Sequence, residues 1–163
     1  MGKYYKKAWP RKILNELITF IEEQHDYEPS LEDISQKTGL SVSNISAQFM
    51  KDDMKLSRAE EIARSYGYEL KLFFPLKEYP FEWANHISRR EFPDAGNLSG
   101  LVKYLYDSNI SITYMSKRIN KHVTLLMNAF KKGDIFLSSL HQVTTNLNIN
   151  VIWIFEKKTS GLQ

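Results

Sequence analysis

The sequence predicts a mainly α-helical protein in which one domain occurs twice, each copy followed by one short β-strand. Three observations support this fold class. The two halves of the 163-residue chain match each other over a long stretch without a gap, apolar residues in both halves recur at helical spacing, and each half ends with a short aromatic and β-branched run. A chain of this length suits one larger domain or two small ones.

The repeat lies at an offset of 81 residues, where residues 28–74 align with residues 109–155. Nine of these 47 positions are identical, whereas unrelated segments of average composition should share about three. Further upstream, residues 14–21 align with residues 98–105 at an offset of 84. The first copy therefore has three extra residues in one turn. Two copies of this length indicate a duplicated domain rather than a solenoid.

Helix signals follow one another along each copy. The apolar residues of the segment 14–21 have helical spacing. Ser30 begins a second helix, with Asp33 three residues later as its capping-box partner, and Gly39 is expected to end it. Either Ser41 or Ser43 should cap a third helix.

The third helix is expected to carry Ile45 and Phe49 on its inward face. A second capping box, with Ser57 as the cap, predicts a fourth helix that ends at Gly67. Asn148 stands at the position of Gly67 in the second copy. Glycine and asparagine both tolerate the left-handed conformation that follows a helix, so both copies should stop at the same place.

Each copy then continues into one predicted strand, over residues 68–74 and residues 149–156. A lone strand leaves backbone groups unpaired. We therefore predict that the two strands pair antiparallel within one chain, as in a homodimer fused into one polypeptide. The alternative is that each strand pairs with its equivalent in a second molecule, which would give a homodimer.

These elements divide the chain into four parts. We expect an N-terminal domain with a basic arm over residues 1–76, a linker over 77–96, a C-terminal domain over 97–156 and a frayed tail over 157–163. The linker is rich in aromatic residues, and residues 82–90 could form a short helix. The arm could enter the minor groove of a duplex or remain a disordered tail.

Composition and motifs exclude several classes of function. The net charge is +3, but the first twelve residues contribute +5 and residues 13–81 sum to −6. The absence of cysteine excludes disulfides, thiolate nucleophiles and cysteine-based zinc sites. The four histidines lack ligand spacing, and the common catalytic and nucleotide-binding motifs are absent. We therefore expect no enzyme activity, metal, cofactor or small-molecule ligand. No apolar run is long enough to span a membrane, so we expect a cytoplasmic location.

The stretch LEDISQKTGLSVSNIS, from Leu31 to Ser46, resembles the helix–turn–helix of Cro/lambda-repressor-like (Xre-type) DNA-binding domains. Residues 49–57 and 62–70 are similar to the later helices of that family. The resemblance covers residues 12–74 well and residues 97–155 more weakly. It implies a duplicated repressor-like domain that binds double-stranded DNA, and a transcriptional regulator of a bacterium, phage or mobile element.

In a helix–turn–helix, the second helix lies in the major groove and its N-terminal side chains reach base edges. Small polar side chains and alanine suit this task. In the first copy the candidate base contacts are Ser41, Ser43, Asn44, Ala47 and Gln48. The candidate phosphate contacts are Lys37, Lys51, Lys55 and Arg58. Helix capping and a solvated face are the alternative roles of these residues.

The second copy departs from this pattern. Asn120 and Lys121 replace the glycine and leucine of the turn, and Leu125 makes the outward face of the third helix more apolar. Its candidate base contacts are His122, Thr124 and Asn128, and its candidate phosphate contacts are Lys117, Arg118, Lys121, Lys131 and Lys132. Two interpretations remain open: weak base reading with phosphate contacts, or a face that binds another protein. In the second case the whole chain could be an interaction module built on a repressor-like fold.

Overall fold

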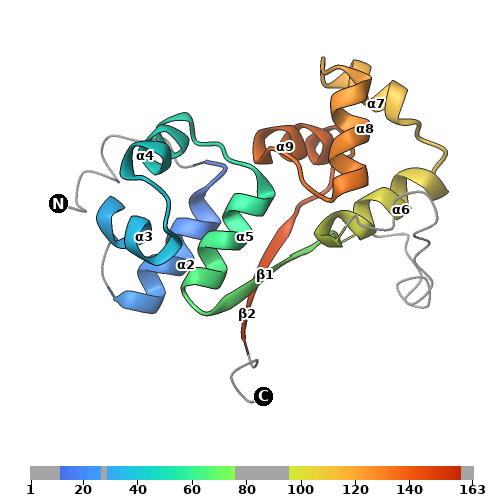
Figure 1. The fold of residues 1–163 in the computed structure, drawn as a ribbon. Helices are drawn as coiled ribbons and strands as arrows, with labels where there is room; N and C mark the ends of the chain where they lie inside the picture. The colour runs from blue at the N-terminus through green and yellow to red at the C-terminus, as the bar shows by residue number, and fades with distance from the viewer. Residues whose placement is uncertain (1–11, 27–28, 76–95, 159–163) are drawn as a thin grey trace. The chain divides into compact units, whose positions relative to one another are not determined.

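The computed structural model describes residues 12–26, 29–75 and 96–158 (Figure 1). Within these residues the protein is mainly helical, with one small antiparallel sheet of two strands, which confirms the mainly helical part of the prediction. The predicted basic arm, the linker helix over 82–90 and the end of the tail lie outside the described residues. Of the predicted tail, residue 157 instead belongs to the second strand.

The chain forms two compact units that are not contiguous in sequence. The first unit comprises the described residues up to Leu70, together with Phe136–Ser138 and residues 155–158. The second unit comprises the described residues between Lys71 and Ile135, together with Ser139–Ile154. Both strands are divided between the units, so each unit contains strand residues from both halves of the sequence.

The helices of the first unit surround one apolar core. They are α2 (Asn15–His25), α3 (Leu31–Thr38), α4 (Val42–Lys51) and α5 (Leu56–Ser65). The helix α3 packs against both α4 and α5. Each helix contributes apolar side chains that are almost fully buried, among them Leu17, Ile34, Ile45, Phe49 and Ile62. Ile45 and Phe49 therefore face inward, as their spacing predicts.

The caps around α3 and α4 match the sequence pattern, whereas the predicted cap of α5 is wrong. The Ser30 and Ser41 hydroxyls accept hydrogen bonds from the backbone N–H groups of Asp33 and Asn44. Gly39 has a φ of 80°, the left-handed conformation that suits a residue without a side chain. However, α5 begins at Leu56, so Ser57 lies inside the helix rather than at its cap.

The helices of the second unit follow the same order. They are a short 3₁₀ helix η2 (Gly96–Leu98), α6 (Ser99–Asp107), α7 (Ile112–Arg118), α8 (Val123–Lys132) and α9 (Leu137–Asn146). The first two residues of α9 belong to the first unit. The core contains Leu101, Met115, Leu126, Phe130 and Val143. Both α8 and α9 begin 81 residues after α4 and α5, as the repeat predicts.

Residues with positive φ mark the turns of the second copy as they do in the first. Asn120 has a φ of 58° and replaces Gly39 without changing the sign of the angle. Asn148 has a φ of 59°, and Gly67, at the aligned position, has a φ of 93°. Asparagine visits this region more readily than most residues because its short polar side chain bonds locally. The backbone thus keeps its left-handed turns where the glycines are lost.

The two strands, β1 (Tyr68–Phe73) and β2 (Ile152–Lys157), pair with each other within one chain, as predicted. However, β2 begins at Ile152 rather than at residue 149, because Asn148 still belongs to the turn after α9. The Lys158 N–H donates to the Gly67 carbonyl at 3.0 Å, which extends the pairing beyond β2.

Alternate residues of the strands face a core. On β1, Leu70 is buried and Lys71 and Phe73 are exposed. In the first unit, the Phe20 ring stacks on Phe155 with ring centroids 3.9 Å apart. In the second unit, the Asn97 side-chain oxygen accepts the Leu72 N–H at 3.1 Å. The Asn97 side chain thus ties β1 to the segment before α6.

Candidate nucleic-acid interface

The exposed face of α4 carries the candidate base contacts of the first copy. Because Ile45 and Phe49 point into the core, the opposite side of this helix faces outward. Ser41, Ser43, Asn44 and Ala47 are exposed, and Gln48 is partly exposed. The structure therefore brings all five candidates onto α4 and its N-cap, within residues 41–48.

Two amide side chains on this face form a pair. The Gln48 Nε2 donates to the Asn44 Oδ1 at 2.6 Å and lies 3.2 Å from the Asn44 carbonyl oxygen. In this arrangement the Asn44 Nδ2 and the Gln48 Oε1 make no hydrogen bond to the described residues and are left as a donor and an acceptor. Adenine presents the complementary set, an N7 acceptor and an N6 donor, in the major groove.

The two serines of this region have different roles. The Ser41 Oγ caps α4 by accepting the Asn44 N–H at 3.2 Å, and it lies 3.4 Å from the Ser43 Oγ. Ser43 is one residue inside the helix and its hydroxyl is exposed. Ser41 is thus tied to the helix end, whereas Ser43 can reach a partner outside the protein.

Side chains within α3 hold the turn before α4. The Thr38 hydroxyl donates to the Ile34 carbonyl at 2.7 Å and accepts the Leu40 N–H at 3.2 Å. The Ser35 hydroxyl donates to the Leu40 carbonyl. Both polar backbone groups of Leu40 are therefore satisfied, which fixes the angle at which α4 leaves α3.

The four candidate phosphate contacts of the first copy differ in exposure and in the contacts that they already make. Lys51 and Lys55 are exposed, and Lys55 lies 5.7 Å from the centre of the Phe136 ring. Lys37 is exposed above the Tyr66 ring at 5.1 Å. Arg58 is the least suited, because it pairs with Glu61 at 3.3 Å and its Nη1 is buried.

Sequence reasoning missed the role of Asp52, at the C-terminal end of α4. Its carboxylate is 6% exposed and accepts three backbone N–H groups, from Lys12, Ile13 and Leu14, at 2.8–3.0 Å. These N–H groups precede α2, where no helical partner exists for them. Asp52 therefore fixes the start of α2 beside the C-terminal end of α4. Its φ of 56° is the only local sign of a special role.

In the second copy, α8 presents a mixed face. His122, Thr124 and Asn128 are exposed, as expected for contacts outside the protein. The His122 Nδ1 accepts the Thr124 N–H at 3.3 Å and so caps the helix. Leu125, which replaces Asn44, is 65% exposed. An exposed apolar side chain thus stands where the first copy has an exposed amide.

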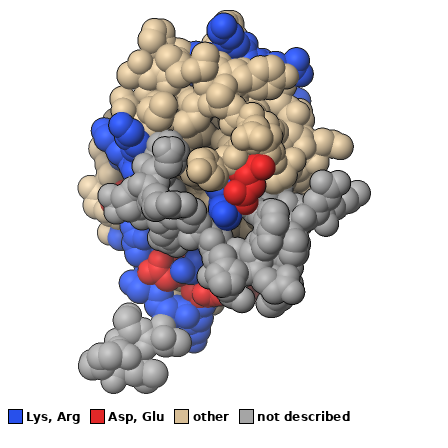
Figure 2. Space-filling view, turned by 90° about the vertical axis from the view of Figure 1, so that its right-hand side faces the viewer, with Lys and Arg blue, Asp and Glu red and all other residues tan. Residues whose placement is uncertain are grey.

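Five cations surround α7 and α8, namely Lys117, Arg118, Lys121, Lys131 and Lys132, and all are exposed. The Arg118 guanidinium lies 6.0 Å from the centre of the exposed Tyr114 ring. Figure 2 looks onto the side of α6 and α7, and most of the surface there is neither basic nor acidic, with Lys and Arg side chains at its edges. The described surface in this view is thus largely uncharged, with basic side chains at its top and left and a small acidic patch near its middle.

The described residues contain no group of histidine, cysteine or acidic side chains that could hold a metal ion. None of their helices has the length and apolar character needed to cross a membrane. Comparison with family models, with curated proteins and with solved structures finds no significant match to this chain.

Proposed function

We propose that the protein binds double-stranded DNA with sequence preference through two helix–turn–helix units of repressor-like type. The observation that carries this proposal is the outward face of α4, where Ser43 and the paired amides of Asn44 and Gln48 are exposed on a helix anchored by a buried face. A helix so anchored can enter a major groove without unfolding any part of the unit.

The surroundings of α4 support the same proposal. Lys37, Lys51 and Lys55 are exposed; the first precedes α4, the second is its last residue and the third follows it. At such positions phosphates would flank the groove. The carboxylate of Asp52 holds Lys12 beside the C-terminal end of α4. Regulation of transcription is the role that this kind of DNA binding would serve.

A specific observation favours a second candidate function. Leu125 and Tyr114 are exposed on α8 and α7, and much of the described surface on the side of α6 and α7 carries no charge (Figure 2). Such a face is suited to another protein. Under this alternative the second unit recruits a protein partner. Such recruitment is compatible with DNA binding by the first unit alone.

The test is a binding selection by the full chain on random duplexes. We expect an enriched motif containing adenine at one or two positions that the Asn44→Ala variant no longer prefers. The Asn146→Ala variant is the matched control, because Asn146 is an exposed amide on α9 that bonds only within its own helix. Recovery of random sequences by the unmodified chain would contradict sequence preference.

A further inference from the structure

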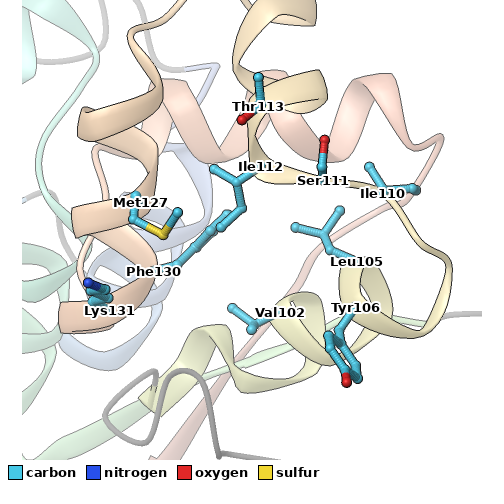
Figure 3. Close-up of a pocket in the computed structure, with 10 residues that line it drawn as sticks. All are labelled: Val102, Leu105, Tyr106, Ile110, Ser111, Ile112, Thr113, Met127, Phe130 and Lys131. Carbon is cyan, nitrogen blue, oxygen red and sulfur yellow. The ribbon is translucent and has the colours of Figure 1, made fainter.

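We propose that the second unit binds a medium-chain carboxylate in a hollow between α6, the start of α7 and α8. The hollow has a volume of about 360 Å³, within the range of roughly 300–1,000 Å³ of small-molecule sites. Figure 3 shows that the side chains of Val102, Leu105, Ile112 and Phe130 point toward its centre from three elements. All of its lining residues belong to one unit.

The walls of this hollow suit an aliphatic body. Branched side chains of Val102, Leu105 and Ile112 face each other across it, and the flexible thioether of Met127 lines one side (Figure 3). Phe130 is fully buried in the unit and closes the inner end. Transfer of an alkyl chain from water onto these walls is favourable by the hydrophobic effect.

One cation gives the hollow its charge. Lys131 is the only charged side chain among the lining residues, and Figure 3 shows it at the edge beside Met127. The hydroxyl of Ser111 accepts the Tyr114 N–H at 3.0 Å and caps α7, which leaves its O–H as a neutral donor. An apolar cavity with a single ammonium at its mouth is complementary to a molecule with an alkyl chain and one terminal carboxylate.

The first copy has no cation at the position of Lys131. Three of the positions that line the hollow differ in charge between the two copies. There the first copy has two carboxylates and no cation, whereas the second copy has one cation and no carboxylate. Glu22, Glu32 and Met50 of the first copy correspond to Tyr106, Thr113 and Lys131 of the second. An anion would thus be repelled at the first copy and attracted at the second.

The consequence for regulation rests on the proposed function, whereas binding itself does not. Lys131 is one of the expected phosphate contacts, and Met127 and Phe130 lie on the same helix, α8. A carboxylate beside Lys131 would neutralise that charge, so the occupied protein should bind duplex DNA more weakly. The carboxylate would then act as an effector of the second unit.

The test is a titration of the full chain with octanoate in the absence of DNA, monitored by the amide chemical shifts in NMR spectra. The octanoate concentration is kept below the value at which octanoate self-associates. We expect saturable shifts confined to residues around this hollow and at least threefold weaker binding of octanol, which lacks the charge. Absence of saturable shifts, equal binding of octanol, or equal shifts in the first copy would overturn the proposal. Loss of DNA binding by the protein would leave this titration unaffected.

Two pairs of variants sharpen the test. Lys131→Met should weaken octanoate binding about threefold to tenfold, whereas Lys132→Met, on the same helix turn but outside the hollow, should leave it unchanged. Thr113→Glu restores the carboxylate of the first copy and should abolish binding, while the neutral Thr113→Gln should retain it. Position 113 is exposed in the first turn of α7, where glutamate favours the helix, so this variant should fold. Equal effects within either pair would contradict an anion site at Lys131.

Discussion

The carboxylate of Asp52 accepts the backbone N–H of Leu14 at 3.0 Å, across 38 positions of the sequence. It also accepts the N–H groups of Lys12 and Ile13, so one buried side chain satisfies three donors at the start of α2. Through these bonds the C-terminal end of α4 and the beginning of the described chain are held together. The stability of the first unit should therefore depend strongly on this residue.

We predict that Asp52→Gly lowers the free energy of unfolding by about 2–4 kcal/mol, because three N–H groups lose a charged acceptor. Glycine is the informative replacement, since it tolerates the φ of 56° and is the residue found at the aligned position 133. The matched control is Asp26→Gly, at an exposed residue with the same φ. Urea denaturation measures both, and a loss at Asp26 equal to that at Asp52 would show that backbone freedom, not the carboxylate, is responsible.

The turn between α7 and α8 should depend on Asn120. Asn120→Ala should destabilise the protein by roughly 1–2 kcal/mol, because a β-carbon without local hydrogen bonding disfavours the φ of 58°. Asn120→Gly should stay within about 0.5 kcal/mol of the unmodified chain. Thermal unfolding of the two variants checks this order, and equal stability of both would argue against a left-handed turn at this position.

The stacked pair of Phe20 and Phe155 should contribute to the attachment of β2 in the first unit. Phe155→Ala removes a ring that lies 3.9 Å from the Phe20 ring and parallel to it within 6°. We expect a loss of about 2 kcal/mol in the free energy of unfolding. Ile154→Thr, at an exposed neighbour that keeps a β-branched side chain, should change the stability by less than about 0.5 kcal/mol. Comparable losses in both variants would assign the effect to the strand rather than to the stacked rings.

Base contacts and phosphate contacts should separate by their effect on specificity. Ser43→Ala or Asn44→Ala should relax preference at one or two base pairs, at a cost on the order of 1–3 kcal/mol. Lys131→Ala and Lys132→Ala should instead weaken binding to all sequences alike. Competition binding with single-base variants of the selected duplex distinguishes these outcomes. Preference that survives both the Ser43 and Asn44 changes would mean that α4 is not the reading helix.

Local sequence signals predicted most of the fold. The spacing of Ile45 and Phe49 identified the buried face of α4, and the serine caps and Gly39 located the ends of α3 and α4. The intrachain pairing of the strands followed from the cost of leaving their backbone groups unpaired. These predictions succeeded because each depends on residues close together in sequence or on a repeat.

The errors arose where long-range contacts override local signals. The Ser57 pattern resembles a cap, yet α5 begins one residue earlier, at Leu56, after the bridge between Lys55 and Phe136. Asn97 bonds to β1 across 25 positions of the sequence, a contact that no local pattern predicts. The partners of Asp52 lie 38 to 40 positions away, so no local pattern identifies it. The residues of the candidate interface were found from sequence, whereas the residue that holds α2 beside it was not.

The most direct test of DNA binding is a titration of a fluorescent duplex with the full chain at several salt concentrations, with circular dichroism to confirm that the protein is folded. If about five phosphates are neutralised, the logarithm of the binding constant should fall with the logarithm of the salt concentration at a slope near −4 to −5. Removal of one exposed cation, as in Lys51→Ala, should reduce that slope by roughly one. A folded protein with no affinity for duplex at low salt would contradict the account.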